Sequence, residues 1–292
     1  MINSRIAMAA MVALALTACS DSGDVTIAAP EELASKNELN NITVEGHATL
    51  PSSASDAAFS KALRRVAING TIVRMSELDS VTLDTTGVFF YSRCDASTGS
   101  FSFDGITLRS PYVKFELAPY QNSEDWNGTW SFEAFDVNEN RYVMVYSAIV
   151  DLRESKNVDV NAFTYLESYR MRRLVRLGNS AVEAKSQAKR EILDAVGLSD
   201  ESYNFDKREF EEDRNHLIAN KVVDDLIFEW SFNASPLQVA NAFGNAGAFT
   251  TVNPVKEFFI DELNKWRADY PVHDDTVEFI DGFIATLYGF EK

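Results

Sequence analysis

The stretch Ser100-Phe101-Ser102-Phe103, with Val113-Lys114-Phe115-Glu116-Leu117 shortly after it, decides the fold of the first half of the chain. Apolar and polar side chains alternate along both segments, and a period of two is typical of strands with one buried face. Seven such short strands, separated by turn residues, indicate an antiparallel β-sandwich over residues 42–155. The other five strands are expected at 42–50, 70–78, 88–93, 130–135 and 142–152.

The hydrophobic period changes to 3.6 after about residue 158. Phe163, Leu166, Leu174 and Leu177 lie on one side of a helical wheel, and Gly178 then ends the helix. Ser180 and Glu183 form a capping box for the next helix. Further helices are expected near 206–232, 236–244, 254–268 and 275–288. We therefore predict an α+β protein with two segregated domains, an N-terminal antiparallel β-sandwich and a C-terminal all-α bundle at 156–292.

The N-terminus has the features of an export signal. A charged start is followed by an apolar run from Ile6 to Leu16, which is too short to span a bilayer. The residues Leu16-Thr17-Ala18-Cys19 resemble the lipobox of bacterial lipoproteins, in which the cysteine is acylated and becomes the first residue of the mature chain. This resemblance implies a signal peptide at 1–18, lipid attachment at Cys19 and a flexible tether at 19–41.

The expected location follows from the same resemblance. In such lipoproteins, a serine directly after the cysteine is typical of transfer to the outer membrane, and Ser20 stands at that position. We therefore expect a lipid-anchored protein of the cell envelope. The chain has 27 Lys and Arg against 44 Asp and Glu, a formal charge of −17. This charge opposes binding to nucleic acid or to an anionic membrane surface. Membrane attachment is therefore expected to come from the lipid.

The strand region also resembles a known sandwich. The segments 91–103, 105–108 and 112–117 are similar to the second half of a carboxypeptidase regulatory-like (transthyretin-like) domain, with a turn glycine before the Phe-x-Phe strand and an aromatic residue opening the next strand. The first half departs from that family, because Thr43–Leu50 and an insertion at 51–65 replace its Gly-rich opening. Residues 158–192 are similar to uncharacterised exported lipoproteins that append a helical domain. The resemblance implies a fold and no activity.

Familiar catalytic and metal motifs are missing from the sequence. His47, His216 and His273 lack the spacing of metal ligands, and helix capping explains Asp274 and Asp275 after the last of them. Cys94 is the only thiol besides Cys19, which excludes a disulfide framework, and we expect it to be buried. We therefore expect no catalytic residue, no cofactor and no metal.

Two acidic segments have alternative interpretations. Asp136-x-Asn138-x-Asn140 begins like a calcium loop, but Arg141 occupies the position of the required glycine, which favours a turn between strands. Paired carboxylates are what glycoside hydrolysis requires. A run of acids could supply such a pair, although crowded acids on one helical turn more often form a solvated face; they are Glu209, Glu211, Glu212 and Asp213.

Four residues are candidates for a structural or binding role. Arg170 lies inside the apolar stripe of its helix, and Glu167 lies near the edge of that stripe. A charge that faces a core needs a partner, so we predict a structural Glu167–Arg170 ion pair, with a ligand-facing guanidinium as the alternative. Tyr120 and Trp126 lie around a polar segment between two strands, where aromatic rings could bind a glycan or an envelope protein.

These observations favour a lipid-anchored exported protein that is not an enzyme and acts as a binding or envelope-assembly module. Its expected partners are the membrane, through the lipid, and a glycan or an envelope protein. The alternative is a hydrolase acting on polysaccharide, with acidic residues in a cleft between the two domains.

Overall fold

The computed structural model describes residues 37–48, 72–95, 98–118, 135–136, 141–142, 146–198, 204–207, 236–249 and 274–289, with short pieces within 216–224 and 260–268. Asn37–Lys292 form one compact unit. The expected signal peptide and Cys19 lie outside the described residues. The expected tether at 19–41 lies outside them up to residue 36, and its last three residues belong to the first strand.

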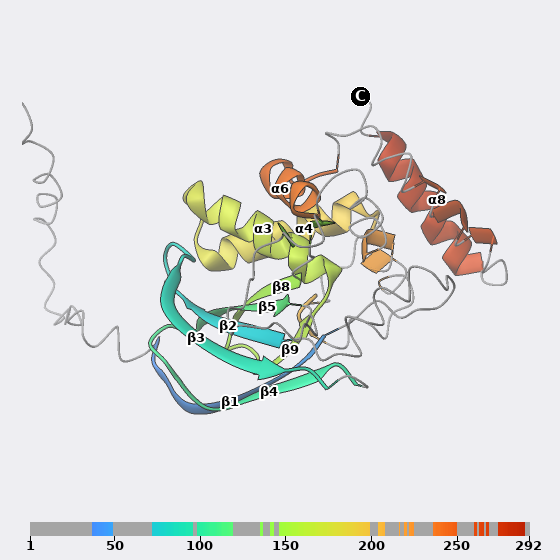
Figure 1. Cartoon of the computed structure of the whole chain (residues 1–292). Coiled ribbons are helices and arrows are strands. Elements are labelled where there is room, and N and C mark those ends of the chain that lie inside the picture. The colour runs from blue at the N-terminus through green and yellow to red at the C-terminus, as the bar shows by residue number, and fades with distance from the viewer. Residues whose placement is uncertain are drawn as a thin grey trace, which may run out of the picture. The chain divides into compact units, whose positions relative to one another are not determined.

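Two sheets form the β-region, together with a separate two-stranded hairpin (Figure 1). The larger sheet has the order β3 (Thr85–Arg93), β2 (Ile72–Leu78), β5 (Tyr112–Ala118) and β8 (Tyr146–Asp151). The smaller sheet has the order β4 (Ser100–Leu108), β1 (Leu39–Ala48) and β9 (Asn157–Val160). The hairpin pairs β6 (Phe135–Asp136) with β7 (Arg141–Tyr142), so residues 137–140 connect two strands.

The smaller sheet is mixed, which differs from the predicted antiparallel sandwich. β9 pairs with β1 in parallel, with Glu45 opposite Asn157 and Ala48 opposite Val160. The sequence pattern predicts that residues from 156 onward belong to the helical domain. Val158 and Val160 instead point into the core, as alternate residues of a strand do.

Phenylalanine rings fill the space between the two sheets. Phe101 and Phe103 of β4 lie 5.8 and 6.0 Å from the ring of Phe115 on β5. Gly46 of β1 lets Phe101 approach, because a Cβ at that position would lie 2.1 Å from the Phe101 Cζ atom. The apolar residues of the alternating pattern, Phe101, Phe103 and Phe115, therefore lie on the buried faces of these strands, as predicted.

The described helices include α3 (Ala162–Arg176), α4 (Ala181–Ala195), α6 (Pro236–Ala246) and α8 (Asp274–Gly289). The predicted capping box of α4 is confirmed, since Ser180 Oγ accepts from the Glu183 amide at 3.3 Å and Glu183 Oε2 accepts from the Ser180 amide at 3.0 Å. Gly178, with φ of 104°, follows the C-cap of α3.

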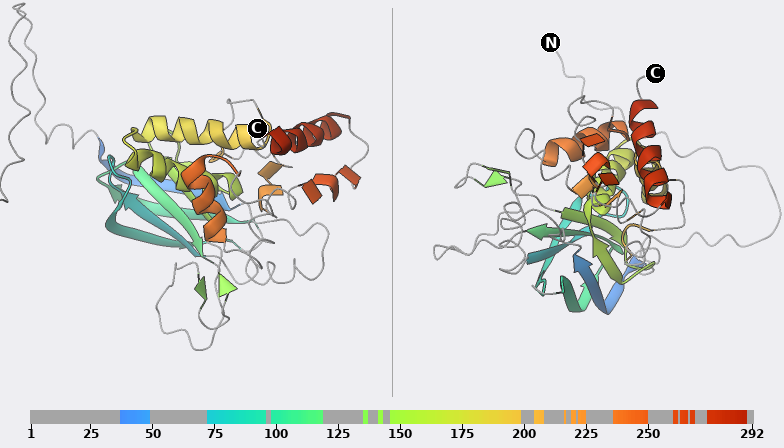
Figure 2. Two further views of the ribbon diagram at one scale, coloured as in Figure 1. Left: turned by 90° about the horizontal axis from the view of Figure 1, so that it is seen from above. Right: turned by 90° about the vertical axis from the view of Figure 1, so that its right-hand side faces the viewer.

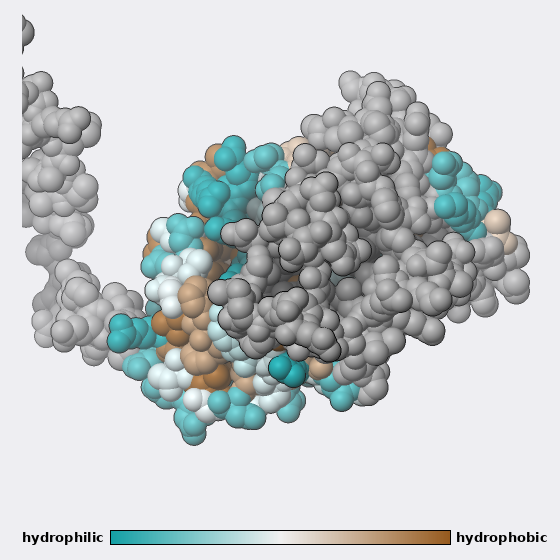
Figure 3. All heavy atoms as spheres, in the orientation of Figure 1, coloured by the Kyte–Doolittle hydropathy of each residue, from teal (hydrophilic) through white to brown (hydrophobic). Residues whose placement is uncertain are grey.

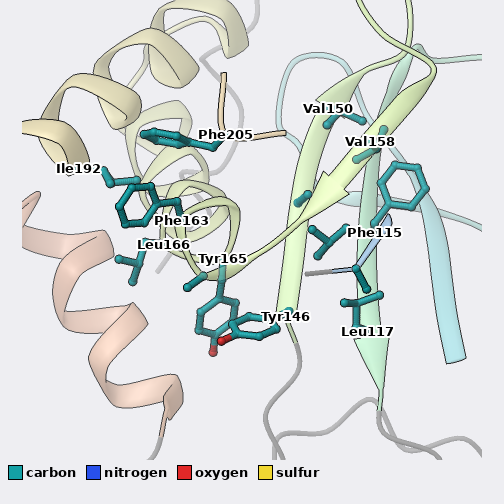
Figure 4. Close-up of a cluster of buried hydrophobic side chains, with 14 of the residues drawn as sticks. Phe115, Leu117, Tyr146, Val150, Val158, Phe163, Tyr165, Leu166, Ile192 and Phe205 are labelled. Atoms are coloured by element: carbon teal, nitrogen blue, oxygen red, sulfur yellow. The ribbon is translucent and has the colours of Figure 1, made fainter. Parts of the chain in front are cut away.

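The prediction of two segregated domains with an all-α C-terminal bundle is wrong. Phe163 of α3 and Ile192 of α4 belong to the same buried cluster as Phe115 of β5 and Val150 of β8 (Figure 4). Both views in Figure 2 show α3 and α4 covering the sheets. The physical reason is β8, whose six residues are all buried, so that the strand needs apolar cover on both faces.

Candidate functional site

A row of polar and aromatic residues crosses the outer face of the larger sheet. Tyr91 of β3 pairs with Arg74 of β2, which pairs with Glu116 of β5, and Glu116 pairs with Ser147 of β8. The neighbouring row consists of Phe89, Ser76, Lys114 and Ile149. We call seven of these residues the aromatic–ionic face: Phe89, Tyr91, Arg74, Ser76, Lys114, Glu116 and Ser147.

Glu116 is the centre of the charged part of this face. Arg74 donates to its Oε2 from Nε at 2.9 Å and from Nη2 at 2.6 Å, and Lys114 Nζ donates to its Oε1 at 2.7 Å. Burial opposes ionisation of Glu116, but the two cations outweigh it and lower its pKa. Glu116 is therefore a carboxylate with both oxygens engaged by cations.

Positive charge exceeds negative charge around Glu116. Arg172 of α3 approaches the face, and its Nη2 lies 3.5 Å from Oδ1 of the exposed Asp84. Burial lowers the pKa of Lys114, and the charges of Arg172 and Arg74 act in the same direction while Glu116 opposes them. Three cations thus surround two carboxylates, in a chain whose formal charge is −17.

Three buried polar atoms beside these charges have no hydrogen-bond partner among the described residues. They are Ser76 Oγ, Ser147 Oγ and Arg172 Nε. Both serines are 1% exposed, and strand alternation places them on the same face as Lys114 and Glu116. Buried polar atoms are normally satisfied, so three unpartnered atoms in one cluster are unusual.

The outer edge of the aromatic–ionic face is apolar and accessible. Phe89 is 41% exposed and Tyr91 is 52% exposed, although both belong to a regular strand. The Arg74 guanidinium lies 5.5 Å from the centre of the Phe89 ring, a cation–π arrangement that supports one side of the ring. The rings offer a flat apolar surface next to hydrogen-bonding groups.

Sequence reasoning missed this face. Arg74, Ser76, Lys114 and Glu116 occupy the polar positions of alternating strands, which look like an ordinary solvated side. The available signal was Phe89-Phe90-Tyr91, because two of three consecutive aromatic residues in a strand must lie on the same face. Phe90 packs against the core, and its neighbours are left outside.

The predicted Glu167–Arg170 ion pair is not formed. Arg170 pairs with Glu191 of α4 through Nε and, at 2.9 Å, through Nη2. Its Nη1 donates to the carbonyls of Gly244 and Asn245 at the end of α6, at 3.0 and 3.1 Å. Arg170 therefore ties three helices together, which agrees with a structural role rather than a ligand-facing one. The helical wheel could not show that α4 would supply the acid.

Glu167 has a different environment. Its Oε2 lies 4.0 Å from Lys185 Nζ, which also donates to Asp206 Oδ2 at 2.6 Å. Burial raises the pKa of Glu167 to about 7; Lys185 lowers it, and Asp206 raises it further. Burial disfavours the charge of Lys185, but Glu167 and Asp206 outweigh this and raise the pKa of the lysine. Such a carboxyl group could transfer a proton near neutral pH, but Glu167 is 2% exposed.

The remaining sequence candidates are placed as follows. His47 Nδ1 lies 3.3 Å from Asp159 Oδ1, within the smaller sheet. Cys94 is buried as predicted, and burial, with the charge of Asp95 acting in the same direction, raises its pKa to about 12, so the thiol is unreactive. Several candidates lie outside the described residues: Tyr120, Trp126, Asn138, Asn140, Glu209, Glu211, Glu212, Asp213 and His273.

Metal ligands and membrane-spanning helices are absent from the described part of the chain. Within it, no group of three or more His, Cys, Asp or Glu side chains is placed to hold a metal ion. Likewise, none of the described helices is long and apolar enough to cross a membrane.

Comparison with known proteins adds no further assignment. Neither the models of protein families, nor the curated proteins, nor the solved structures contain a match to this chain.

Proposed function

We propose that this chain is a lipid-anchored binding module of the bacterial cell envelope, that it is not an enzyme, and that its aromatic–ionic face binds an acidic glycan. The proposed anchor is Cys19 and the proposed location is the outer membrane. The observation that carries the proposal is the exposure of Phe89 and Tyr91 beside the Arg74–Glu116–Lys114 group.

The chemistry of a sugar fits both parts of the face. The C–H side of a sugar ring is apolar and packs on an aromatic ring, while its hydroxyl groups need donors and acceptors at the edge. Tyr91 and Phe89 supply the rings, and the Arg74–Glu116 ion pair lies beside them. The excess of positive charge near Lys114 and Arg172 favours a ligand with carboxylate or phosphate groups.

The test is crosslinking on intact cells with a photoreactive residue at Tyr91. A second variant carries the same residue at Val88, which lies in the same strand and is 39% exposed. We expect the Tyr91 variant to capture sugar-bearing material, and Tyr91→Ala to remove binding of the purified glycan. Capture of protein alone would favour an envelope-assembly role, and capture no greater than at Val88 would refute binding at this face.

The anchor is tested separately by acyl labelling. Wild type is expected to incorporate a labelled fatty acid, and Cys19→Ala is expected to lose the label. Retention of label in Cys19→Ala would refute the assignment of the attachment site.

The described residue that the alternative of a polysaccharide hydrolase would use is Glu167, which has a pKa of about 7 close to Lys185 and Asp206 but is 2% exposed. These three residues do not lie in a cleft between two domains, because they belong to the layer where the helices pack on the sheet. If the chain is a hydrolase, Glu167→Gln abolishes release of reducing sugar from envelope polysaccharide. If the group is structural, the variant alters stability alone.

A further inference from the structure

We propose that one end of the compact unit rests on the phospholipid surface to which Cys19 attaches the chain. This docking end consists of the β2–β3 turn at 79–84, the last two turns of α3 and the first turn of α4. The proposal rests on the lipid anchor of the proposed function, and it shares Arg172 and Asp84 with the charges beside the aromatic–ionic face.

The hairpin turn and the helices form one continuous surface. Asp84 Oδ1 lies 3.5 Å from Arg172 Nη2 and 3.9 Å from Arg176 Nη2. Leu83, which follows the tip of the turn, is buried in one cluster with Leu174 of α3 and Ala181 of α4. Figure 1 shows the turn between β2 and β3 beside the connection between α3 and α4.

The docking end exposes large apolar side chains that the fold does not use. Val81 is 74% exposed, Leu177 is 61% exposed and Val182 is 58% exposed, which are the three highest values for large apolar residues in the described part of the chain. They come from the hairpin, the end of α3 and the start of α4. Figure 3 shows apolar atoms among hydrophilic ones on this side of the molecule. Isolated exposed apolar residues are common, but three at one end indicate a contact surface.

The path of the chain favours a bilayer as the partner of the docking end. Asn37 begins the compact unit, and its Oδ1 accepts from Arg153 Nη1 at 3.1 Å. The Arg153 guanidinium lies 5.7 Å from the centre of the Tyr112 ring, and Tyr112 belongs to the same buried cluster as Leu83. The chain from Cys19 therefore enters at the docking end.

The connecting segment is long enough for the docking end to reach the membrane. Cys19 precedes Asn37 by 18 residues, which reach at most about 60 Å when fully extended. The opposite end of the sandwich, at the β3–β4 turn, is separated from the docking end by the nine residues of β3, or roughly 30 Å. The connecting segment therefore permits contact by either end, and the exposed apolar residues Val81, Leu177 and Val182 favour the docking end.

Local charge agrees with a phospholipid surface. The chain as a whole is acidic, which opposes adsorption to anionic lipid. The docking end is different, because Arg172, Arg173 and Arg176 of α3 balance Asp79, Asp84 and Glu183 and leave this end close to neutral. Arginine side chains beside exposed apolar residues place their guanidinium groups among lipid phosphates while their stems cover apolar surface.

The test uses the acylated full chain on vesicles of phosphatidylethanolamine and phosphatidylglycerol. A thiol-reactive fluorophore is attached at Leu177→Cys, and a matched control carries it at Ser100→Cys, an exposed position beside the β3–β4 turn. Buried Cys94 does not compete for the label, since its pKa is about 12. We expect lipids brominated in their acyl chains to quench the Leu177 label and to leave the Ser100 label bright.

Each other result has a distinct meaning. If the acylated chain is on the vesicles and the two labels are quenched equally, or Ser100 more, the docking inference is refuted and the anchor stands. If the chain does not sediment with the vesicles, the anchor is refuted and the docking inference with it. If the Leu177 label of Cys19→Ala shifts to the blue without vesicles, increasingly with protein concentration, the occupant is a second copy of the chain and not lipid.

Discussion

Replacing Glu167 with glutamine is expected to stabilise the protein above neutral pH. Glu167 is 2% exposed, its Oε1 has no hydrogen-bond partner among the described residues, and its Oε2 is 4.0 Å from Lys185 Nζ. Burial is the largest cause of its raised pKa, and Lys185 compensates for only part of it. The ionised form of Glu167 therefore fits the folded protein poorly.

The size and sign of the effect follow from proton linkage. Glutamate titrates near 4.5 in the unfolded chain and near 7 in the folded protein. Between these values the folded state binds more protons, so the contribution of Glu167 to stability is complete below pH 4.5 and decreases as pH rises to 7. The loss amounts to roughly 3 kcal/mol, since one pKa unit corresponds to about 1.4 kcal/mol. Glutamine carries no charge, so Glu167→Gln should regain about 2–3 kcal/mol at pH 8 and little at pH 4.5.

The assay is urea denaturation of the full chain at pH 4.5 and pH 8. Glu183→Gln is the control, because Glu183 is an exposed glutamate of a capping box and glutamine keeps the box. The difference in unfolding free energy between wild type and each variant cancels the contribution of other acidic groups. The reasoning is refuted if Glu167→Gln loses stability at pH 8, which would mean that an ionised Glu167 and Lys185 stabilise the fold.

Three further perturbations test other parts of the structure. Arg170→Leu should lower the unfolding free energy by about 3–5 kcal/mol in urea, because it removes the cation that pairs with the partly buried Glu191; an unchanged value would contradict the structural role. Gly247→Ala should lower the thermal midpoint far more than Gly87→Ala. Both glycines have a positive φ, but of the two only Gly247 would bring its Cβ against another residue, 2.6 Å from Glu191 Oε2. Equal shifts of the midpoint would contradict this contact. Tyr91→Ala should weaken glycan binding, as measured by calorimetry, while changing the unfolding free energy by less than about 1 kcal/mol, because the side chain is half exposed. A large loss of unfolding free energy together with the loss of binding would mean that Tyr91 is part of the core.

Local chemistry predicts local structure well in this chain. The capping box of Ser180 and Glu183 and the termination at Gly178 are correct because each depends on neighbouring residues only. The alternation of Phe101, Phe103 and Phe115 also identifies the buried face, since its period is fixed by the backbone of a strand. None of these features depends on how distant segments meet.

The errors concern long-range partners. Val158 and Val160 fit a strand or the start of a helix equally well, and pairing with β1, more than a hundred residues earlier, decides between them. Arg170 needs an acid, but Glu167 at i−3 and Glu191 on the next helix are both suitable by type, and packing selects the second. A sequence pattern therefore shows that a residue needs a partner, but it does not show where in the chain that partner lies.

The core that the sheets share with α3 and α4 also depends on long-range packing. A mostly apolar strand such as β8, with Ala148, Ile149 and Val150, is consistent with burial on both sides. In β8 the inner face packs in the sandwich, and Ile149 on the outer face joins a cluster with Leu174 of α3 and Ala184 of α4. The helices therefore complete the sheet instead of folding as a bundle of their own.

This layered arrangement connects the two proposals. α3 and α4 cover the outer face over β5, β8 and Leu78 at the end of β2, whereas β3 at the edge keeps Phe89 and Tyr91 exposed. The hairpin that carries Tyr91 ends at the docking end, and the seven residues from Asp84 to Tyr91 span roughly 23 Å along the strand. If the unit rests on lipid through this end, the aromatic–ionic face stands beside the bilayer at about that height. Its ligand must then extend close to the membrane surface, as a polymer or headgroup-linked glycan attached there would.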